Sequence, residues 1–161
     1  STPIAPTAVG PTVPAPATPG ATSIPKNTGL NPEHLAKLME GVDAWNAWRT
    51  QNPTVLPELK NAKLAEAKLV KINLKRAGLF KAQLNNANLS KANLALANLS
   101  KANLVGANLE KANLNGANLR GTDLTNAILT DAKLTNAKYD SVTKWPAGFD
   151  PVAAGAKLVT P

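Results

Sequence analysis

The sequence predicts an all-β solenoid, a coil that stacks turn upon turn around an apolar core. Three observations predict this fold class. Leucine occupies every fifth position from Leu59 to Leu134, sixteen in succession, and Tyr139 takes the next place. A small residue, nearly always alanine, stands two places before each of these residues after Leu59. The other three positions of each five-residue unit are mostly polar, as expected of an outer surface.

A period of five fits neither an α-helix nor a straight strand. Five helical residues turn through roughly 500°, so successive leucines would spread around the helix axis. In a straight strand, an odd spacing would send successive leucines to opposite faces. The chain must therefore turn once per unit, so that the leucine and the residue two places before it share one interior. An Asn often precedes the leucine, and we expect this Asn to occupy the corner, because its amide binds local backbone.

Residues 1–30 contain seven prolines among Ala, Thr, Ser and Gly, without apolar periodicity. This composition predicts a flexible tail or tether, since it cannot bury enough apolar surface to offset the entropy of ordering. The alternative is a segment that becomes ordered on a partner.

Residues 31–51 predict one α-helix. Asn31 can cap its N-terminus, Pro32 suits its first turn, and Asn52-Pro53 ends it. Apolar residues recur at the three- and four-residue spacing of one helix face. These residues are Leu35, Leu38, Met39, Val42, Trp45 and Trp48.

Both ends of the solenoid are expected to carry caps, because open coil ends invite edge-to-edge growth. The N-terminal cap is expected in residues 31–56 and the C-terminal cap in residues 142–161, on either side of the repeat in residues 57–141. The alternative for an end cap is a contact with a second copy of the chain. The expected capping residues are Trp45, Trp48, Trp145, Phe149 and Val152.

The tandem A(N/D)LXX units, as in ANLSKANLALANLSKANL, resemble those of the pentapeptide-repeat proteins. The resemblance covers residues 57–141 and implies a right-handed, four-sided β-helix of about four coils with an N-terminal capping α-helix. The flanking stretches VDAWNAWRTQNP and TKWPAGFDPVAAGAKLV are similar to flanks of cyanobacterial members. That similarity implies a cytoplasmic or thylakoid-associated protein.

The sequence carries no phosphate loop, dinucleotide fingerprint, HExxH motif or nucleophile–His–acid set. Its single histidine, His34, has no second His or carboxylate pair nearby to complete a metal site, so we expect a packed or solvated side chain. Asp123 and Asp131 form no evident acid–base pair. We therefore predict a non-catalytic protein without a cofactor.

The net charge of +8 is concentrated in the repeat, where thirteen Lys and Arg stand against six Asp and Glu. Residues twenty apart should stack in one column and residues ten apart should lie on opposite sides of a four-sided coil. The lysines therefore form two opposed columns, which could serve solubility alone. The candidate partner-binding residues are Lys71, Lys91, Lys111, Lys81, Lys101, Phe80 and Leu96.

The basic surface and the tail predict a scaffold or interaction module that docks on an acidic protein assembly. By resemblance, a linker role in a photosynthetic antenna, the phycobilisome, is one such function. Some family members bind topoisomerases by mimicking DNA, but that mechanism requires an acidic surface. Weak nucleic-acid binding fits the charge, although stacking aromatics are few and specific readout is not expected. No apolar run reaches the roughly 18–20 residues that span a bilayer.

Overall fold

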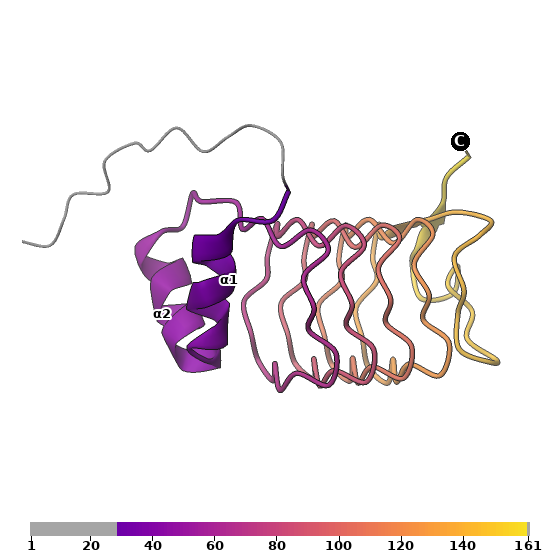
Figure 1. The fold of residues 1–161 in the computed structure, drawn as a ribbon. Coiled ribbons are helices and arrows are strands. Elements are labelled where there is room, and N and C mark those ends of the chain that lie inside the picture. The colour runs from indigo at the N-terminus through magenta and orange to yellow at the C-terminus, as the bar shows by residue number, and fades with distance from the viewer. Residues whose placement is uncertain (1–28, 161) are drawn as a thin grey trace, which may run out of the picture.

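The chain winds into a stack of coils with two helices against one end, in a computed structural model that describes residues 29–160 (Figure 1). Most of the expected tail, residues 1–28, lies outside the described residues. Of the tail, Gly29 and Leu30 are described, and Leu30 forms an antiparallel bridge with Leu59 of the first coil. The expected tail therefore ends in a segment that pairs with the solenoid.

One coil takes twenty residues, which is four five-residue units. Parallel bridges join Asn73 to Asn93 and Asn93 to Asn113, and the same step recurs around the stack. The alanine and leucine positions are buried along nearly the whole repeat. This confirms the prediction that they share one interior. Each buried leucine contributes about 1.5–3 kcal/mol relative to an exposed one.

The corner of each unit follows the leucine. The N–H of Ala77 donates to the carbonyl of Leu74 at 3.0 Å, and the residue before Ala77, Arg76, has a φ of 60°. A positive φ at the third of four residues is the arrangement of a type II turn. The prediction that Asn occupies the corner is therefore wrong: Asn93 bridges in the middle of a side, where its Oδ1 accepts from the N–H of Ala95 at 3.1 Å.

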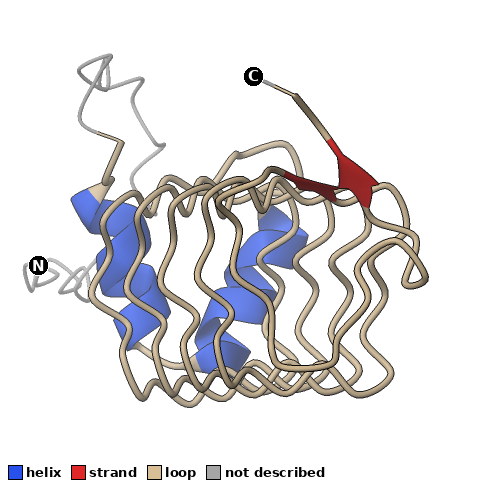
Figure 2. Ribbon diagram, turned by 90° about the vertical axis from the view of Figure 1, so that its right-hand side faces the viewer, coloured by secondary structure: helices blue, strands red, loops and turns tan. Residues whose placement is uncertain are grey.

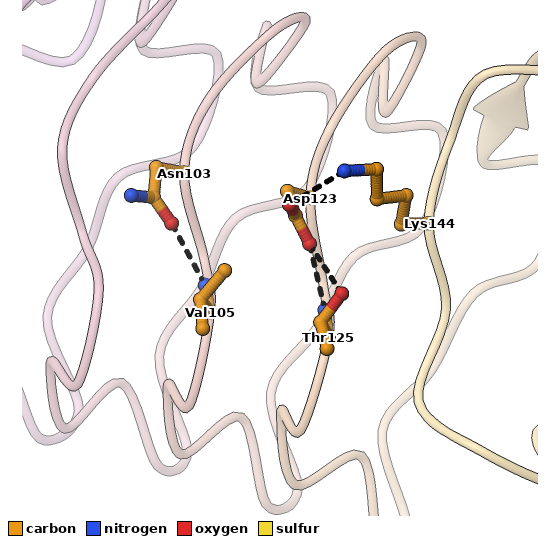
Figure 3. Close-up of polar contacts among 5 residues, drawn as sticks. All are labelled: Asn103, Val105, Asp123, Thr125 and Lys144. Carbon is orange, nitrogen blue, oxygen red and sulfur yellow. Dashed lines mark hydrogen bonds and ion pairs between the residues drawn. The ribbon is translucent and has the colours of Figure 1, made fainter.

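Asp123 replaces the asparagine in its unit and makes the same bond. Asn103 accepts a hydrogen bond from the N–H of Val105 at 3.1 Å, and Asp123 accepts from the N–H of Thr125 at 3.0 Å (Figure 3). The Thr125 hydroxyl also donates to Asp123, at 2.6 Å, and is the main cause of the lowered pKa of this carboxyl. Lys144 lies 3.4 Å from its other oxygen. Asp123 is thus engaged in holding a corner.

Two helices stand where the sequence predicted one. They are α1 (Pro32–Met39) and α2 (Val42–Gln51), and Gly41 separates them with a φ of 111°, a conformation that other residues rarely adopt. Asn31 caps α1 as predicted, accepting from the N–H groups of Glu33 and His34. The break ends the single apolar stripe, so Met39 is 70% exposed and does not pack as expected.

Helix α2 supplies hydrogen bonds to one open side of the first coil. Trp45, which is fully buried, donates from Nε1 to the carbonyl of Asn73 at 2.8 Å. Asn46 accepts from the N–H of Asn73 at 2.8 Å. The guanidinium of Arg49 donates to the carbonyls of Val55 and Lys75 at 2.6 and 3.1 Å. The bonds to Asn73 and Lys75 occupy backbone groups that a preceding coil would otherwise pair.

A second open side of the first coil is met by the segment before α1. The N–H of Asn31 donates to the carbonyl of Glu58 at 2.8 Å, and the N–H of Lys60 donates to the carbonyl of Gly29 at 2.7 Å. His34 is buried, packs its ring against Trp48, and accepts at Nδ1 from the N–H of Glu58 at 3.1 Å. The single histidine is therefore a packed residue with a backbone partner.

Protonation of His34 is expected to destabilise this end of the molecule. Burial lowers the pKa of His34, against weaker opposing effects of Glu58 and Glu33 and with a small contribution from Arg49. The unfolded chain, with a histidine pKa of about 6.5, therefore takes up the proton first as the pH falls. Stability from this group is complete above about pH 6.5 and decreases below it, down to the lowered pKa.

Urea denaturation at pH 7 and pH 5 measures this effect. The midpoint of the wild-type protein should fall at pH 5 by more than that of His34→Gln, whose amide oxygen can still accept from Glu58 and does not titrate. Equal pH dependence of the two proteins would show that His34 is not the titrating group.

At the other end, the regular step changes. Asp123 bridges Lys144, which is twenty-one residues later, and β1 (Lys138–Tyr139) pairs in parallel with β2 (Lys157–Leu158), drawn as red arrows in Figure 2. The partly buried Trp145 lies edge-on to Tyr139 at 5.5 Å and stacks on Phe149 at 5.2 Å. Val152 is 66% exposed, so its expected packing on the last coil is wrong.

Candidate protein-docking face

One corner of the solenoid, followed from coil to coil, gathers an aromatic ring and four cations. We call it the Phe80 edge, and it consists of Lys60, Phe80, Lys81, Lys101 and Arg120. Phe80, Lys81 and Lys101 were predicted as outward candidates, whereas Lys60 and Arg120 were missed. The twenty-residue step counted from Phe80 is the signal that could have found them.

Three lysine ammonium groups surround the half-buried Phe80 ring. The Nζ atoms of Lys60, Lys81 and Lys101 lie 5.5, 5.4 and 5.9 Å from the ring centroid. These distances fall within cation–π range. Among residues 29–160, the ion pairs involve other side chains, so none of these ammonium groups has a carboxylate partner there. An anion placed at this edge would relieve the mutual repulsion of the ammonium groups.

A shallow hollow of about 200 Å³ adjoins the ring. Its lining residues are Phe80, Ser100, Lys101, Asn118, Arg120 and Asp140. Asp140 accepts from the N–H of Gly121 and the hydroxyl of Thr143, both at 2.9 Å. Desolvation raises the pKa of Asp140, but these hydrogen bonds outweigh it and the pKa is lowered. The hollow therefore presents two cations beside one fixed carboxylate.

The other predicted lysine column lies ten residues away along the coil, at the diagonally opposite corner. Lys71, Lys91 and Lys111 are exposed there, but Lys111 lies 3.4 Å from Glu110 and Asp131 follows in the same column. This corner is less basic than the Phe80 edge. The structure thus separates the five candidate lysines and brings only Lys81 and Lys101 to the aromatic ring.

Leu96 lies at the corner next to the Phe80 edge. It is 58% exposed, has a φ of 59°, and covers Gly116 so closely that a Cβ there would meet its side chain at 2.6 Å. A bulky apolar residue at positive φ is unusual. Between the two corners runs the side formed by Glu58, Gly78, Asn98, Asn118 and Lys138. We call this side with its two corners the docking face.

The docking face offers a surface of mixed chemical character. Its basic side chains include the four cations of the Phe80 edge and Lys138. Beside them lie the apolar side chains of Phe80 and Leu96 and the side-chain amides of Asn98 and Asn118, with Glu58 and Asp140 as acidic groups. Among residues 29–160, no cluster of three His, Cys, Asp or Glu could hold a metal ion. In that same part of the chain, no helix has the length and apolarity to cross a membrane. The arrangement suits binding of an acidic surface.

Comparisons with known proteins agree with this architecture. A family model described as pentapeptide repeats matches eight copies over residues 58–94, 79–116 and 102–138. The crystal structure of alr5209, a pentapeptide repeat protein from Nostoc Pcc 7120, is 36% identical with a TM-score of 0.67 and covers 73% of this chain and 95% of its own. Rfr23 from the cyanobacterium Cyanothece 51142 is 38% identical, with a TM-score of 0.34, over 52% of this chain and 67% of its own. No curated protein sequence matches the chain.

Proposed function

This chain belongs to the pentapeptide-repeat family, and from that premise we propose that it is a non-catalytic module that binds an acidic protein through the docking face. One observation carries the proposal. Three lysine ammonium groups surround Phe80, and none of them has a carboxylate partner among the described residues. Such a cluster is costly in isolation and favourable against an acidic surface.

We propose a right-handed solenoid of about four coils with a cap at each end. Family members fold as right-handed quadrilateral β-helices. The bonds of Trp45 and Arg49 to the first coil support an N-terminal cap, as does the packing of Trp48 on Trp45. Trp145 and Phe149 support a C-terminal cap. The exposed Val152 and Leu158 at that end favour the alternative contact with a second copy, which stays a prediction.

The acidic assembly that we would test first is the phycobilisome, because solved relatives come from cyanobacteria. Lys81→Glu/Lys101→Glu should weaken co-sedimentation of the protein with isolated phycobilisomes by about tenfold or more, since charges change sign at the Phe80 edge of the docking face. Binding of the wild type and of each variant to phycobilisomes should weaken as the salt concentration rises.

Lys71→Glu/Lys91→Glu is the matched control. All four lysines occupy the same corner position, with φ between 56° and 61°, so both variants change the net charge and the local backbone equally. The control should lose less than about threefold affinity. Equal losses in the two variants would overturn the docking face. If the protein bound duplex DNA more tightly than phycobilisomes, and the Phe80-edge variant Lys81→Glu/Lys101→Glu lost that binding, the partner would be a nucleic acid and not an acidic protein.

A further inference from the structure

We propose that the element of the partner that binds the Phe80 edge is an acidic α-helix lying parallel to the solenoid axis. This inference rests on the proposed docking function and adds the structural class of the partner. It follows from the axial spacing of the cations, from their lack of carboxylate partners among residues 29–160, and from the carboxylate that ends their row.

The cations of the Phe80 edge repeat once per coil. Lys60, Lys81, Lys101 and Arg120 lie on four successive coils, since one coil takes twenty residues. Stacked strands are ~4.8 Å apart, so the row advances by that distance at each step. An α-helix presents a residue on the same face every ~5.4 Å, through the i, i+3, i+4 and i+7 positions. The two repeats nearly match.

An extended peptide matches the row less well. Alternate residues of a strand lie on one face at ~6.6 Å, so three steps accumulate a mismatch of about 5 Å. For a helix, the same three steps accumulate about 2 Å. Lysine and arginine side chains can absorb the smaller difference by changing rotamers. A helix with one acidic residue per turn can therefore engage all four cations at once.

Asp140 ends the row. It lies twenty residues after Arg120, one coil further along the same corner, and its Oδ1 is already held by Gly121 and Thr143. Its fixed negative charge would repel a further acidic turn. The matching helix therefore has about four acidic residues over three turns, with a neutral or basic residue facing Asp140. Its apolar atoms would contact the Phe80 ring, and its last acidic residue would pair with Lys101 and Arg120 on the side of the hollow away from Asp140.

Three peptides of equal composition test the inference by fluorescence anisotropy with the full chain at low salt. In the first, glutamates at i, i+4, i+7 and i+11 form one stripe of an alanine-rich helix. The second spreads the glutamates around the helix. All three peptides contain prolines, which the first two carry at their ends. The third keeps the striped order of glutamates but has two of its prolines in the middle, where they break the helix. The striped helix should bind about tenfold more tightly than either control, since several ion pairs form together.

The variants separate the two proposals. Lys81→Glu/Lys101→Glu should abolish the preference for the striped helix, and Lys71→Glu/Lys91→Glu should preserve it. If the proline-containing or scrambled peptide binds as tightly as the striped helix, the edge recognises charge alone; the helix inference is then overturned while the docking proposal stands. If the Phe80-edge variant binds phycobilisomes as well as the wild type does, the docking proposal fails whatever the peptides show.

Discussion

Replacing Leu99 with aspartate is expected to remove much of the stability of the solenoid. Leu99 is fully buried in the leucine column, with Leu79 and Leu119 one coil away on either side. The substitution removes apolar contact and places a carboxyl group among aliphatic side chains that offer it no partner. The expected cost exceeds about 4 kcal/mol, against a total stability of about 5–15 kcal/mol for a typical domain. Circular dichroism and urea denaturation measure it.

Asn98→Asp is the matched control, because it introduces the same residue one position earlier. Asn98 accepts from the N–H of Ser100 at 3.1 Å, a bond that Asp123 shows a carboxylate can make at the equivalent position. We expect this control to change the free energy of unfolding by less than about 1 kcal/mol. If Leu99→Asp had the urea midpoint of Asn98→Asp, the interior could not be the dry leucine column described here.

Replacing Trp45 with alanine is the second large effect. The indole is fully buried, lies 5.1 Å from the Trp48 ring, and bonds the carbonyl of Asn73. Truncation leaves a large cavity and an unpaired carbonyl, for an expected loss of about 3–5 kcal/mol of unfolding free energy. The first coil would also become accessible, so we expect the variant to associate in light scattering.

Trp45→Phe separates packing from hydrogen bonding. It keeps an aromatic ring against Trp48 but cannot donate to Asn73, so about 1–3 kcal/mol should be lost. A Trp45→Ala protein that unfolds at the wild-type urea concentration would show that α2 is not part of the cooperative unit. If Trp45→Phe lost as much unfolding free energy as Trp45→Ala, the stability would come from the hydrogen bond alone.

The interior was predictable because its pattern admits one solution. A leucine at every fifth position can be buried only if the chain turns once per unit, and this requires no knowledge of neighbouring coils. The corner was harder to place. An Asn side chain can bond local backbone either from within the turn or from the side that precedes it. Its preference for turns therefore did not decide between these two positions.

Features that depend on tertiary contacts were missed or misplaced. The stripe from Leu35 to Trp48 keeps helical spacing through Gly41, so the break is visible only in its φ of 111°. Asn46 and Arg49 had no sequence signal, because the backbone groups that they satisfy become unpaired only when the first coil ends. The five candidate lysines were predicted as two columns on opposite sides, but the gathering of Lys60, Lys81 and Lys101 around one ring depends on contacts between coils.

The twenty-residue coil has a consequence for how such chains can change. Deleting one unit, for example residues 86–90, would keep each leucine inside and turn everything after it by a quarter of a revolution. Val105 and Gly106 would then lie beside Phe80 and Lys81, where Ser100 and Lys101 lie now. Deleting four units would shorten the rod and restore the original alignment. Gain or loss of single units during evolution can therefore change which surface residues lie side by side, while the buried leucine column is kept.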